Sequence, residues 1–312
     1  MNVLVTGGAG FIGSHLVRAL HGRGDRVVVL DNLSTGSRAN LAGLPIDLVV
    51  ADLTEADQVR AAVRGMEVVF HLGAMISVPL SFDNPAACYQ TNLLGSLHVL
   101  EAARREGVRR VVLASSCAIY GDRDRPARED DPARPTSPYA GSKVAMEDLA
   151  RLYGRAFSVE SVILRYFNVY GPGQDPRSPY AAAIPLFLEA LLAGQAPLIH
   201  GDGRQSRDFV FVEDVVAANL QAAQASAAAG QTFNIASGTS ASLLDVMAVL
   251  RRLLPSSPDP AFGQARPGDI RSSAADIARA AEALGYRPAH DLHQGLLATV
   301  EWMRARPKPS AE

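Results

Sequence analysis

Short apolar runs rich in β-branched residues recur along the first half of the chain, and stretches with helical spacing separate them. Apolar runs of four or five residues, bounded by glycine or polar residues, are typical of strands buried in a parallel sheet. Such runs occupy residues 1–5, 26–30, 46–50, 68–72, 111–114 and 162–166. The longest helical stretches are 85–106 and 138–156. This alternation predicts an α/β fold with a doubly wound parallel sheet and helices on both faces.

The regular alternation stops after residue 166, where prolines and glycines become frequent and short helical and strand patterns mix. This change predicts a second, smaller domain of mixed α/β structure. We assign residues 1–165, together with roughly 206–237, to the first domain. Residues 166–205 and 238–312 are assigned to the second domain.

A glycine turn separates the first strand from the first helix. In this setting Gly7 lets the chain turn sharply, Gly10 lets a pyrophosphate approach the backbone, and Gly13 lets the helix pack closely on the sheet. The free N–H groups at the start of the helix, around Phe11 and Ile12, would face the phosphates. The order of strand, glycine turn and helix therefore predicts a dinucleotide site.

The second strand ends at Asp31-Asn32, about 20 residues after the glycines, where an acidic residue accepts hydrogen bonds from a ribose. A carboxylate there repels a 2′-phosphate, so NAD is favoured over NADP as the cofactor. The alternative is that Asp31 only organises a turn. Ligands of such sheets bind outside the carboxyl ends of the strands. A Rossmann-type NAD site at this edge would also include Asp52, Gly73, Ala74, Ser115 and Ser116, which follow or end other strands.

The composition describes a globular protein without a nucleic-acid or acidic-membrane partner, because 48% of its 312 residues are hydrophobic and its net charge is −2. Two cysteines, Cys88 and Cys117, cannot build a disulfide framework or a zinc site. The histidines have no metal-binding spacing, so we expect no metal. The N-terminal apolar run lacks a basic start and is broken by glycines, so we expect a strand and not a signal peptide. These features favour a reducing, cytoplasmic location.

Tyr139 and Lys143 are four residues apart on a predicted helix, so they share one face. A free tyrosine has a pKa near ~10 and is a poor base at neutral pH. A neighbouring ammonium favours the phenolate, and so does the positive nicotinamide of NAD. Tyr139 is therefore a candidate general base for a hydroxyl group, which Ser116 could orient. The alternative is an ordinary pair on the helix surface.

Further motifs accompany these residues along nearly the whole chain. They are residues 7–13, 31–33, 52–53, 71–74, 115–121, 137–143, 165–172, 201–203, 207–209 and 266–269. With these motifs the chain resembles the extended short-chain dehydrogenase/reductase family, and in particular its UDP-sugar 4-epimerase branch, of the UDP-glucose or UDP-N-acetylglucosamine type. A non-catalytic NAD-sensing module on this fold tends to lose the Tyr–Lys pair, which this chain keeps.

The resemblance implies an enzyme that inverts C4 of a UDP-hexose. Tyr139 would take the proton of the C4 hydroxyl while NAD takes the C4 hydride, and Lys143 would tune Tyr139. The 4-keto sugar would turn over in the site and receive the hydride on its opposite face. NAD would be regenerated in each cycle and stay tightly held. The resemblance also implies a homodimer through the helices near 85–106 and 138–156.

The strand ends and the resemblance together assign the binding residues. Cofactor contacts are assigned to Gly7, Gly10, Phe11, Ile12, Gly13, Asp31, Asn32, Asp52, Leu53, Leu72, Gly73, Ala74, Asn92, Ser115, Tyr139, Lys143 and Tyr166. Substrate contacts are assigned to Ser77, Ser116, Cys117, Asn168, Arg207, Arg266, Asp269 and Ser273. Among these, Arg207 and Arg266 would bind the UDP phosphates, because guanidinium geometry suits paired oxygens.

Departures from the family pattern bear on the reaction and the sugar. Cys117 and Ala118 stand where dehydratases carry an acidic pair, which argues against dehydration and decarboxylation. Ile76 replaces a lysine that hexose epimerases often have near the cofactor ribose. Ser273 is small where some epimerases block N-acetylated sugars, so UDP-N-acetylglucosamine is permitted beside UDP-glucose. Asn168 counts against UDP-glucuronate, but a UDP-glucuronate 4-epimerase and a nucleotide-sugar dehydratase or reductase remain alternatives.

Overall fold

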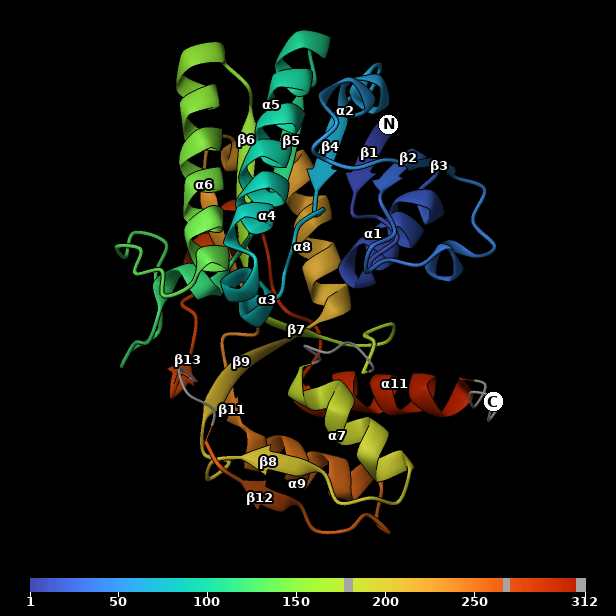
Figure 1. The fold of residues 1–312 in the computed structure, drawn as a ribbon, viewed down its shortest axis with the longest axis vertical. Coiled ribbons are helices and arrows are strands. Elements are labelled where there is room, and N and C mark those ends of the chain that lie inside the picture. Colours follow the sequence, from blue (N-terminus) through green and yellow to red (C-terminus); the bar gives the residue numbers. More distant parts are fainter. Residues whose placement is uncertain (177–181, 266–269, 307–312) are drawn as a thin grey trace.

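The computed structural model describes residues 1–176, 182–265 and 270–306 (Figure 1). Its central feature is a seven-stranded sheet in the order β10-β6-β5-β4-β1-β2-β3, and all neighbouring strands are parallel. The strands are β1 (Asn2–Thr6), β2 (Arg26–Asp31), β3 (Asp47–Val50), β4 (Val68–His71), β5 (Arg110–Ser116), β6 (Ser161–Tyr166) and β10 (Thr232–Ile235). The six predicted strands are confirmed, and a seventh joins from residues beyond the regular alternation.

Helices cover both faces of this sheet, as predicted. One face packs against α1 (Phe11–Gly22), α8 (Val212–Gln224) and α10 (Ala278–Ala283), with Leu16 and Phe233 in the core between them. The other face packs against α2 (Ala56–Val63), α5 (Gly95–Glu106) and α6 (Pro138–Phe157). Because the inner strands are buried on both sides, their sequences are continuous apolar runs. The predicted doubly wound fold is confirmed.

The helical stretch predicted at 85–106 is not one regular helix. It consists of α4 (Pro85–Tyr89), a π-helical segment (Gln90–Leu94) and α5, and a short helix α3 (Val78–Asp83) precedes it. The π-helical turn contains the buried Asn92. Such turns are rare and often lie at functional sites.

A smaller region lies below the sheet in Figure 1 and has two small sheets. The first contains β7 (Asn168–Tyr170), β9 (Ser206–Phe211), β11 (Ser240–Ser242) and β13 (Ser272–Ser273), and the second pairs β8 (Leu198–His200) with β12 (Ala261–Gly263). Its apolar cluster joins α7 (Ala183–Leu192), α9 (Leu243–Leu253) and α11 (Leu292–Ala305). β9 belongs to a small sheet, whereas α8 and β10 pack with the large one. The domain boundaries stay a prediction.

No helix in the described part of the chain is both long and apolar enough to cross a membrane.

The glycine turn lies where the strand order reverses, between β1 and β4. Gly7 has a φ of +69°, and a Cβ on it would come within 2.7 Å of the backbone nitrogen of Gly73. A Cβ on Gly13 would overlap the carbonyl oxygen of Gly7. A Cβ on Gly10, in contrast, would have one close protein neighbour, the carbonyl oxygen of Gly7 at 3.2 Å. Gly7 and Gly13 are thus required by packing, while Gly10 keeps the crevice clear.

The packing at Gly13 predicts a stability difference along a single helix. Gly13→Ala should lower the free energy of unfolding by about 2 kcal/mol, because the added methyl group must displace backbone. Gly22→Ala on the same helix should leave it unchanged or raise it slightly, because its methyl group would meet nothing within 4 Å. Thermal and urea unfolding of the two variants measure this difference. Equal stability would show that the Gly7–Gly13 contact is not tight.

Candidate active site

Asp31 connects the end of β2 to the glycine turn. Its side chain is buried, and its two carboxylate oxygens accept hydrogen bonds from the backbone N–H groups of Ala9 (2.9 Å) and Leu33 (2.8 Å). Ala9 lies within the glycine turn. The carboxylate therefore holds the turn in place and organises the chain after β2. Asp31 therefore does organise a turn, which was the alternative considered from the sequence. This role does not conflict with a position beside the predicted dinucleotide site.

The ends of β3 and β4 complete this side of the crevice. Asn32 donates a hydrogen bond to the carboxylate of Asp52 at 2.7 Å. Burial opposes ionisation of Asp52, but hydrogen bonds from Thr54 and Asn32 hold its pKa below the usual range. Leu53 packs against Gly73, whose N–H donates to the Thr6 hydroxyl at 3.1 Å. The predicted cofactor residues after β2, β3 and β4, among them Leu72 and Ala74, thus come together at one edge.

Asn92 and Ser77 shape the loop after β4. The Asn92 amide accepts from the backbone N–H of Met75 at 2.7 Å and donates to the hydroxyl of Ser142 on α6 at 3.0 Å. Ser77 caps α3 by accepting from the N–H of Leu80. Asn92 therefore fixes the loop to α6, beside the crevice.

The three predicted catalytic residues are close together and buried or half-buried. Ser116 lies at the carboxyl end of β5, and Tyr139 lies in the first turn of α6, where the Ser116 hydroxyl acts on the phenol. Ser137 caps this helix, which begins at Pro138, where the predicted helical stretch 138–156 begins. The ammonium group of Lys143 donates to the carbonyl oxygen of Ala114 on β5 at 2.8 Å. This arrangement places a phenol and a hydroxyl at the rim of the sheet.

Burial shifts the two titratable groups in opposite directions. It raises the pKa of Tyr139 to about 12, although the hydrogen bond from Ser116 favours the phenolate. It lowers the pKa of Lys143 to about 8, against the effect of Cys88 and Glu147. The predicted effect of Lys143 on Tyr139 is therefore insufficient by itself, and the phenol stays protonated near neutral pH. Further positive charge beside it is needed to make it a base.

Cys117, Ser273 and Arg207 form one group beside the catalytic residues. Ser273 and Arg207 both act on the Cys117 thiol by lowering its pKa, and Ser273 is the strand partner of Arg207. Burial raises the pKa of the Cys117 thiol to about 11, so it remains neutral. Arg266 and Asp269, two further predicted substrate contacts, lie outside the described residues.

Arg207 and Asn168 line a cavity of about 280 Å³ beside the carboxyl end of β6. Most of the other lining residues were not identified from the sequence, among them Phe187, Leu198 and His200. The nearest signal was the motif at 201–203, which directly follows His200. The apolar residues on α7 and β8 are spaced like those of an ordinary buried helix or strand. Their sequence pattern therefore does not show that they line a cavity.

Two predicted cofactor contacts direct their side chains into the protein. The hydroxyl of Ser115 donates to the carboxylate of Glu147 at 2.6 Å. The hydroxyl of Tyr166 donates to Asn219 on α8 at 2.9 Å, and its ring lies in the core. A contact of either residue with the cofactor stays a prediction.

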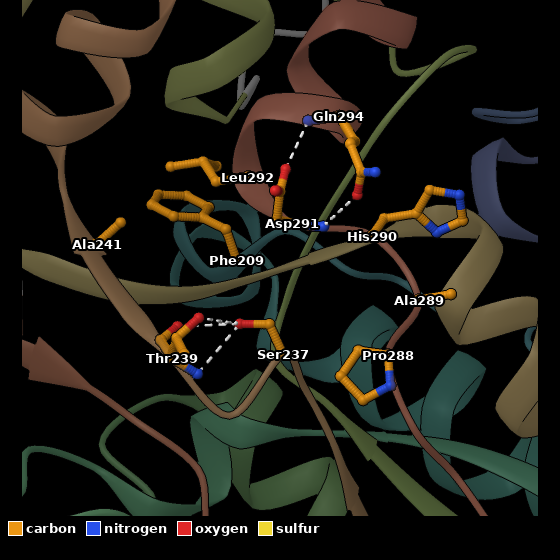
Figure 2. A pocket seen from close by; sticks show the side chains of 10 residues that line it. All are labelled: Phe209, Ser237, Thr239, Ala241, Pro288, Ala289, His290, Asp291, Leu292 and Gln294. Atoms are coloured by element: carbon orange, nitrogen blue, oxygen red, sulfur yellow. Dashed lines mark hydrogen bonds between the residues drawn. The ribbon is translucent and has the colours of Figure 1, made fainter.

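A second cavity, of about 420 Å³, lies in the smaller region (Figure 2). None of the predicted site residues that the structure describes lines this cavity. Figure 2 shows a hydrogen bond between Ser237 and Thr239. It also shows two reciprocal hydrogen bonds between Asp291 and Gln294 at the start of α11. These polar groups cap turns and a helix. The candidate active site is therefore the crevice at the edge of the sheet.

Comparisons with known proteins show which family the chain belongs to. The chain matches the NAD dependent epimerase/dehydratase family over residues 3–236. A UDP-glucose 4-epimerase of Mycolicibacterium smegmatis is 41% identical over 311 residues, covering 97% of this chain and 99% of that protein. The UDP-glucose 4-epimerase of Thermotoga maritima, solved with UDP-glucose, is 37% identical with a TM-score of 0.94, covering 97% of this chain and 99% of that one.

The UDP-glucose 4-epimerase of Thermus thermophilus, solved with NAD, is also similar in sequence and structure. It is 37% identical with a TM-score of 0.90, and the match covers 98% of this chain and 99% of that one. These matches extend over the sheet, the crevice and the smaller region alike. The chain is thus an enzyme of the NAD-dependent epimerase/dehydratase family, within the extended short-chain dehydrogenases/reductases, and belongs to their UDP-sugar 4-epimerases.

Proposed function

We propose that this enzyme inverts C4 of a UDP-hexose through a transient 4-keto intermediate, with Tyr139 as the base. The observation that carries the proposal is that Tyr139 at the start of α6 and Ser116 at the end of β5 interact, while Lys143 on the same helix donates to the carbonyl oxygen of Ala114 on β5 at 2.8 Å. This group lies on the edge of the sheet that also carries the glycine turn, with β4 between them. On its other side, Cys117 and Ser273 connect the rim to the cavity that Arg207 lines. Cofactor and nucleotide sugar would therefore meet at Tyr139.

The residues at the sheet edge fit NAD. The space that Gly10 keeps clear suits a pyrophosphate, and Asp31 with Asn32 suits a ribose. Gly73 and Ala74 would border the nicotinamide half. When bound, NAD supplies a hydride acceptor that later returns the hydride, and its positive ring lowers the pKa of the neighbouring phenol.

The protein's own residues would handle the proton. Tyr139 would take the proton of the C4 hydroxyl and return it after the sugar has turned. Ser116 would hold that hydroxyl by a shared hydrogen bond, and Lys143 would keep a positive charge nearby. Because all three are buried or half-buried, water is largely excluded and electrostatic effects are strong.

The cavity beside β7 would hold the UDP part of the substrate. Phe187 and Leu198 offer apolar walls for a flat base, and His200 lines the same cavity. Arg207 offers a guanidinium for the diphosphate. Asn168 donates to the carbonyl oxygen of Asp208, which holds its amide beside the cavity.

The sugar-facing residues favour epimerisation of a neutral hexose. Cys117 remains a neutral thiol and Ala118 has no ionisable group, so this position offers no acid or base for eliminating water. The small Ser273 leaves room for an N-acetyl group. UDP-glucose and UDP-N-acetylglucosamine are the proposed substrates, with UDP-glucuronate as the second candidate and a dehydratase or reductase after it.

Exposed apolar side chains on adjoining segments support a homodimer. Phe82 on α3, Tyr89 on α4, Leu94 in the π-helical turn, and Leu152 and Phe157 on α6 are all exposed. α3, α4 and α5 all pack against α6, so these side chains belong to one group of helices. A large exposed apolar surface commonly marks a protein interface, and most homo-oligomers are twofold dimers. We propose that a second copy covers it.

Removing the phenolic hydroxyl tests the reaction. Tyr139→Phe should lower kcat about a thousandfold, because the proton acceptor is lost, while bound NAD is retained. Inversion at C4 is followed by NMR with UDP-glucose, UDP-N-acetylglucosamine and UDP-glucuronate separately, without added NAD. Tyr153→Phe is the control on the same helix, since its hydroxyl contacts Glu101. Full activity of Tyr139→Phe would refute the assignment.

Changing the carboxylate at the end of β2 tests the cofactor site. Asp31→Asn should weaken NAD binding about tenfold or more, because it replaces a charged acceptor of the turn and the ribose with a neutral one. Asp47→Asn, an exposed carboxylate at the start of β3, is the control. Calorimetric titration of NAD into the cofactor-stripped proteins measures the difference. Equal affinities would mean that the ribose lies elsewhere.

A charge placed on α6 tests the dimer. Leu152→Glu should yield monomers, because burying the new carboxylate would cost more than the contact gains. The control is Phe262→Glu, which places the same charge at an exposed apolar site on β12, in the smaller region. Light scattering after gel filtration gives the mass of each variant. A Leu152→Glu dimer would place the interface on another surface.

A further inference from the structure

A buried carboxylate that the proposed reaction does not use lies one helical turn beyond Lys143. Glu147 is 1% exposed and accepts hydrogen bonds from the Ser115 hydroxyl at 2.6 Å and from Nε and Nη2 of Arg165 at 2.9 and 2.7 Å. Arg151 donates to it from the solvent side at 2.6 Å. Such a buried ion pair is costly to desolvate and is weak evidence for a role in stability.

The partner of Glu147 is itself held rigidly. Nη1 of Arg165 donates to the hydroxyl of Tyr120 at 2.7 Å and to the backbone carbonyl of Glu129, and its guanidinium stacks over the Tyr120 ring. Tyr120 in turn donates to Asn234 on β10 at 2.6 Å. The network thus spans α6, β5, β6 and β10. Its polar groups are satisfied by one another, which favours a single arrangement.

The positions of these contacts relate α6 to the catalytic residues. Ser115 and Arg165 face each other in the register of β5 and β6, and each directly precedes a predicted site residue, Ser116 and Tyr166. Lys143 contacts the carbonyl oxygen of Ala114, one residue earlier on β5. The two contacts of α6 with β5 are therefore consecutive on the strand and one turn apart on the helix. They fix the height and rotation of the helix that carries Tyr139.

The network also places a negative charge near Lys143. Besides burial, Cys88 on α4 and Glu147 on its own helix act on the pKa of Lys143, and Lys143 in turn acts on His71 of β4. Burial lowers the pKa of Lys143, whereas Cys88 and Glu147 raise it. His71 is neutral, because burial lowers its pKa to about 3. Glu147 is thus the carboxylate that favours the ammonium form of Lys143.

We propose that Glu147 is a positioning residue for the Tyr139–Lys143 pair: through its hydrogen bonds to Ser115 and Arg165, it sets the place of α6 on β5 and β6. Glu147 touches neither the substrate nor the cofactor in this proposal and acts through α6. The inference rests on the proposed function, because it requires that Tyr139 and Lys143 carry the chemistry.

Two substitutions separate the effect of the charge of Glu147 from the effect of its side-chain length. Glu147→Gln keeps the length and removes the charge, so kcat should fall about tenfold and the high-pH limb of kcat should move down by about one pH unit. Its KM should change little. Glu147→Asp keeps the charge but shortens the side chain, so kcat should fall while the high-pH limb stays in place. The control is Asp148→Asn, an exposed carboxylate on the same helix, which should match the wild type.

A third variant separates catalysis from folding. Glu147→Gln leaves Arg165 buried without its charged partner and can fail to fold. The double variant Glu147→Met with Arg165→Met removes both charges, and it should fold and still show the shifted limb. Should neither fold, Glu147→Asp decides by its kcat at unchanged KM.

Wild-type kcat and wild-type pH dependence in a folded Glu147→Gln or double variant would overturn the inference, as would unchanged kcat in Glu147→Asp. A loss of stability alone would mean a purely structural role. The activity of Tyr139→Phe distinguishes a failure of the Glu147 inference from a failure of the proposed function. If Tyr139→Phe is inactive while the Glu147 variants behave as wild type, only the inference fails. If Tyr139→Phe is active, the proposed function fails first.

Discussion

The close approach of two backbone segments at the point where the strand order reverses is the constraint on which the site depends. Gly7 after β1 and Gly73 after β4 are so close that a Cβ on Gly7 would reach the nitrogen of Gly73 at 2.7 Å. Gly13 brings α1 against the same turn. Asp31 holds the same turn from β2 by accepting a hydrogen bond from the backbone N–H of Ala9.

Burial dominates the electrostatics of the catalytic residues. The same low-polarity surroundings raise the pKa of Tyr139 to about 12 and lower that of Lys143 to about 8. A buried phenol of this kind is inert until a positive charge arrives beside it. A base that is activated by its own cofactor avoids reacting before the cofactor is in place. The buried ion pair of Glu147 and Arg165 lies one helical turn beyond Lys143.

Residues that could be identified from the sequence lie in local patterns. The strands follow from apolar runs, and Ser137-Pro138 marks the start of α6 because capping and the fixed φ of proline act locally. The π-helical turn at Asn92 was missed, since its hydrogen bonds to Met75 and Ser142 come from the loop after β4 and from α6. The small sheets were predicted only as mixed structure, because strands of two or three residues, such as β13, have no periodicity.

The sheet and the glycine turn could be predicted from the sequence, and Tyr139, Lys143 and Ser116 could be proposed from it, because each depends on neighbours along the chain or on motif spacing. What surrounds these residues could be learned only from the folded protein. Glu147 and Arg165 are 18 residues apart, and the pairing of β6 with β5 and the packing of α6 bring them together. The wall of the cavity that Arg207 lines likewise joins α7, β8 and β9. Side chains distant in sequence meet only when the whole core has packed, and no local pattern records which ones will.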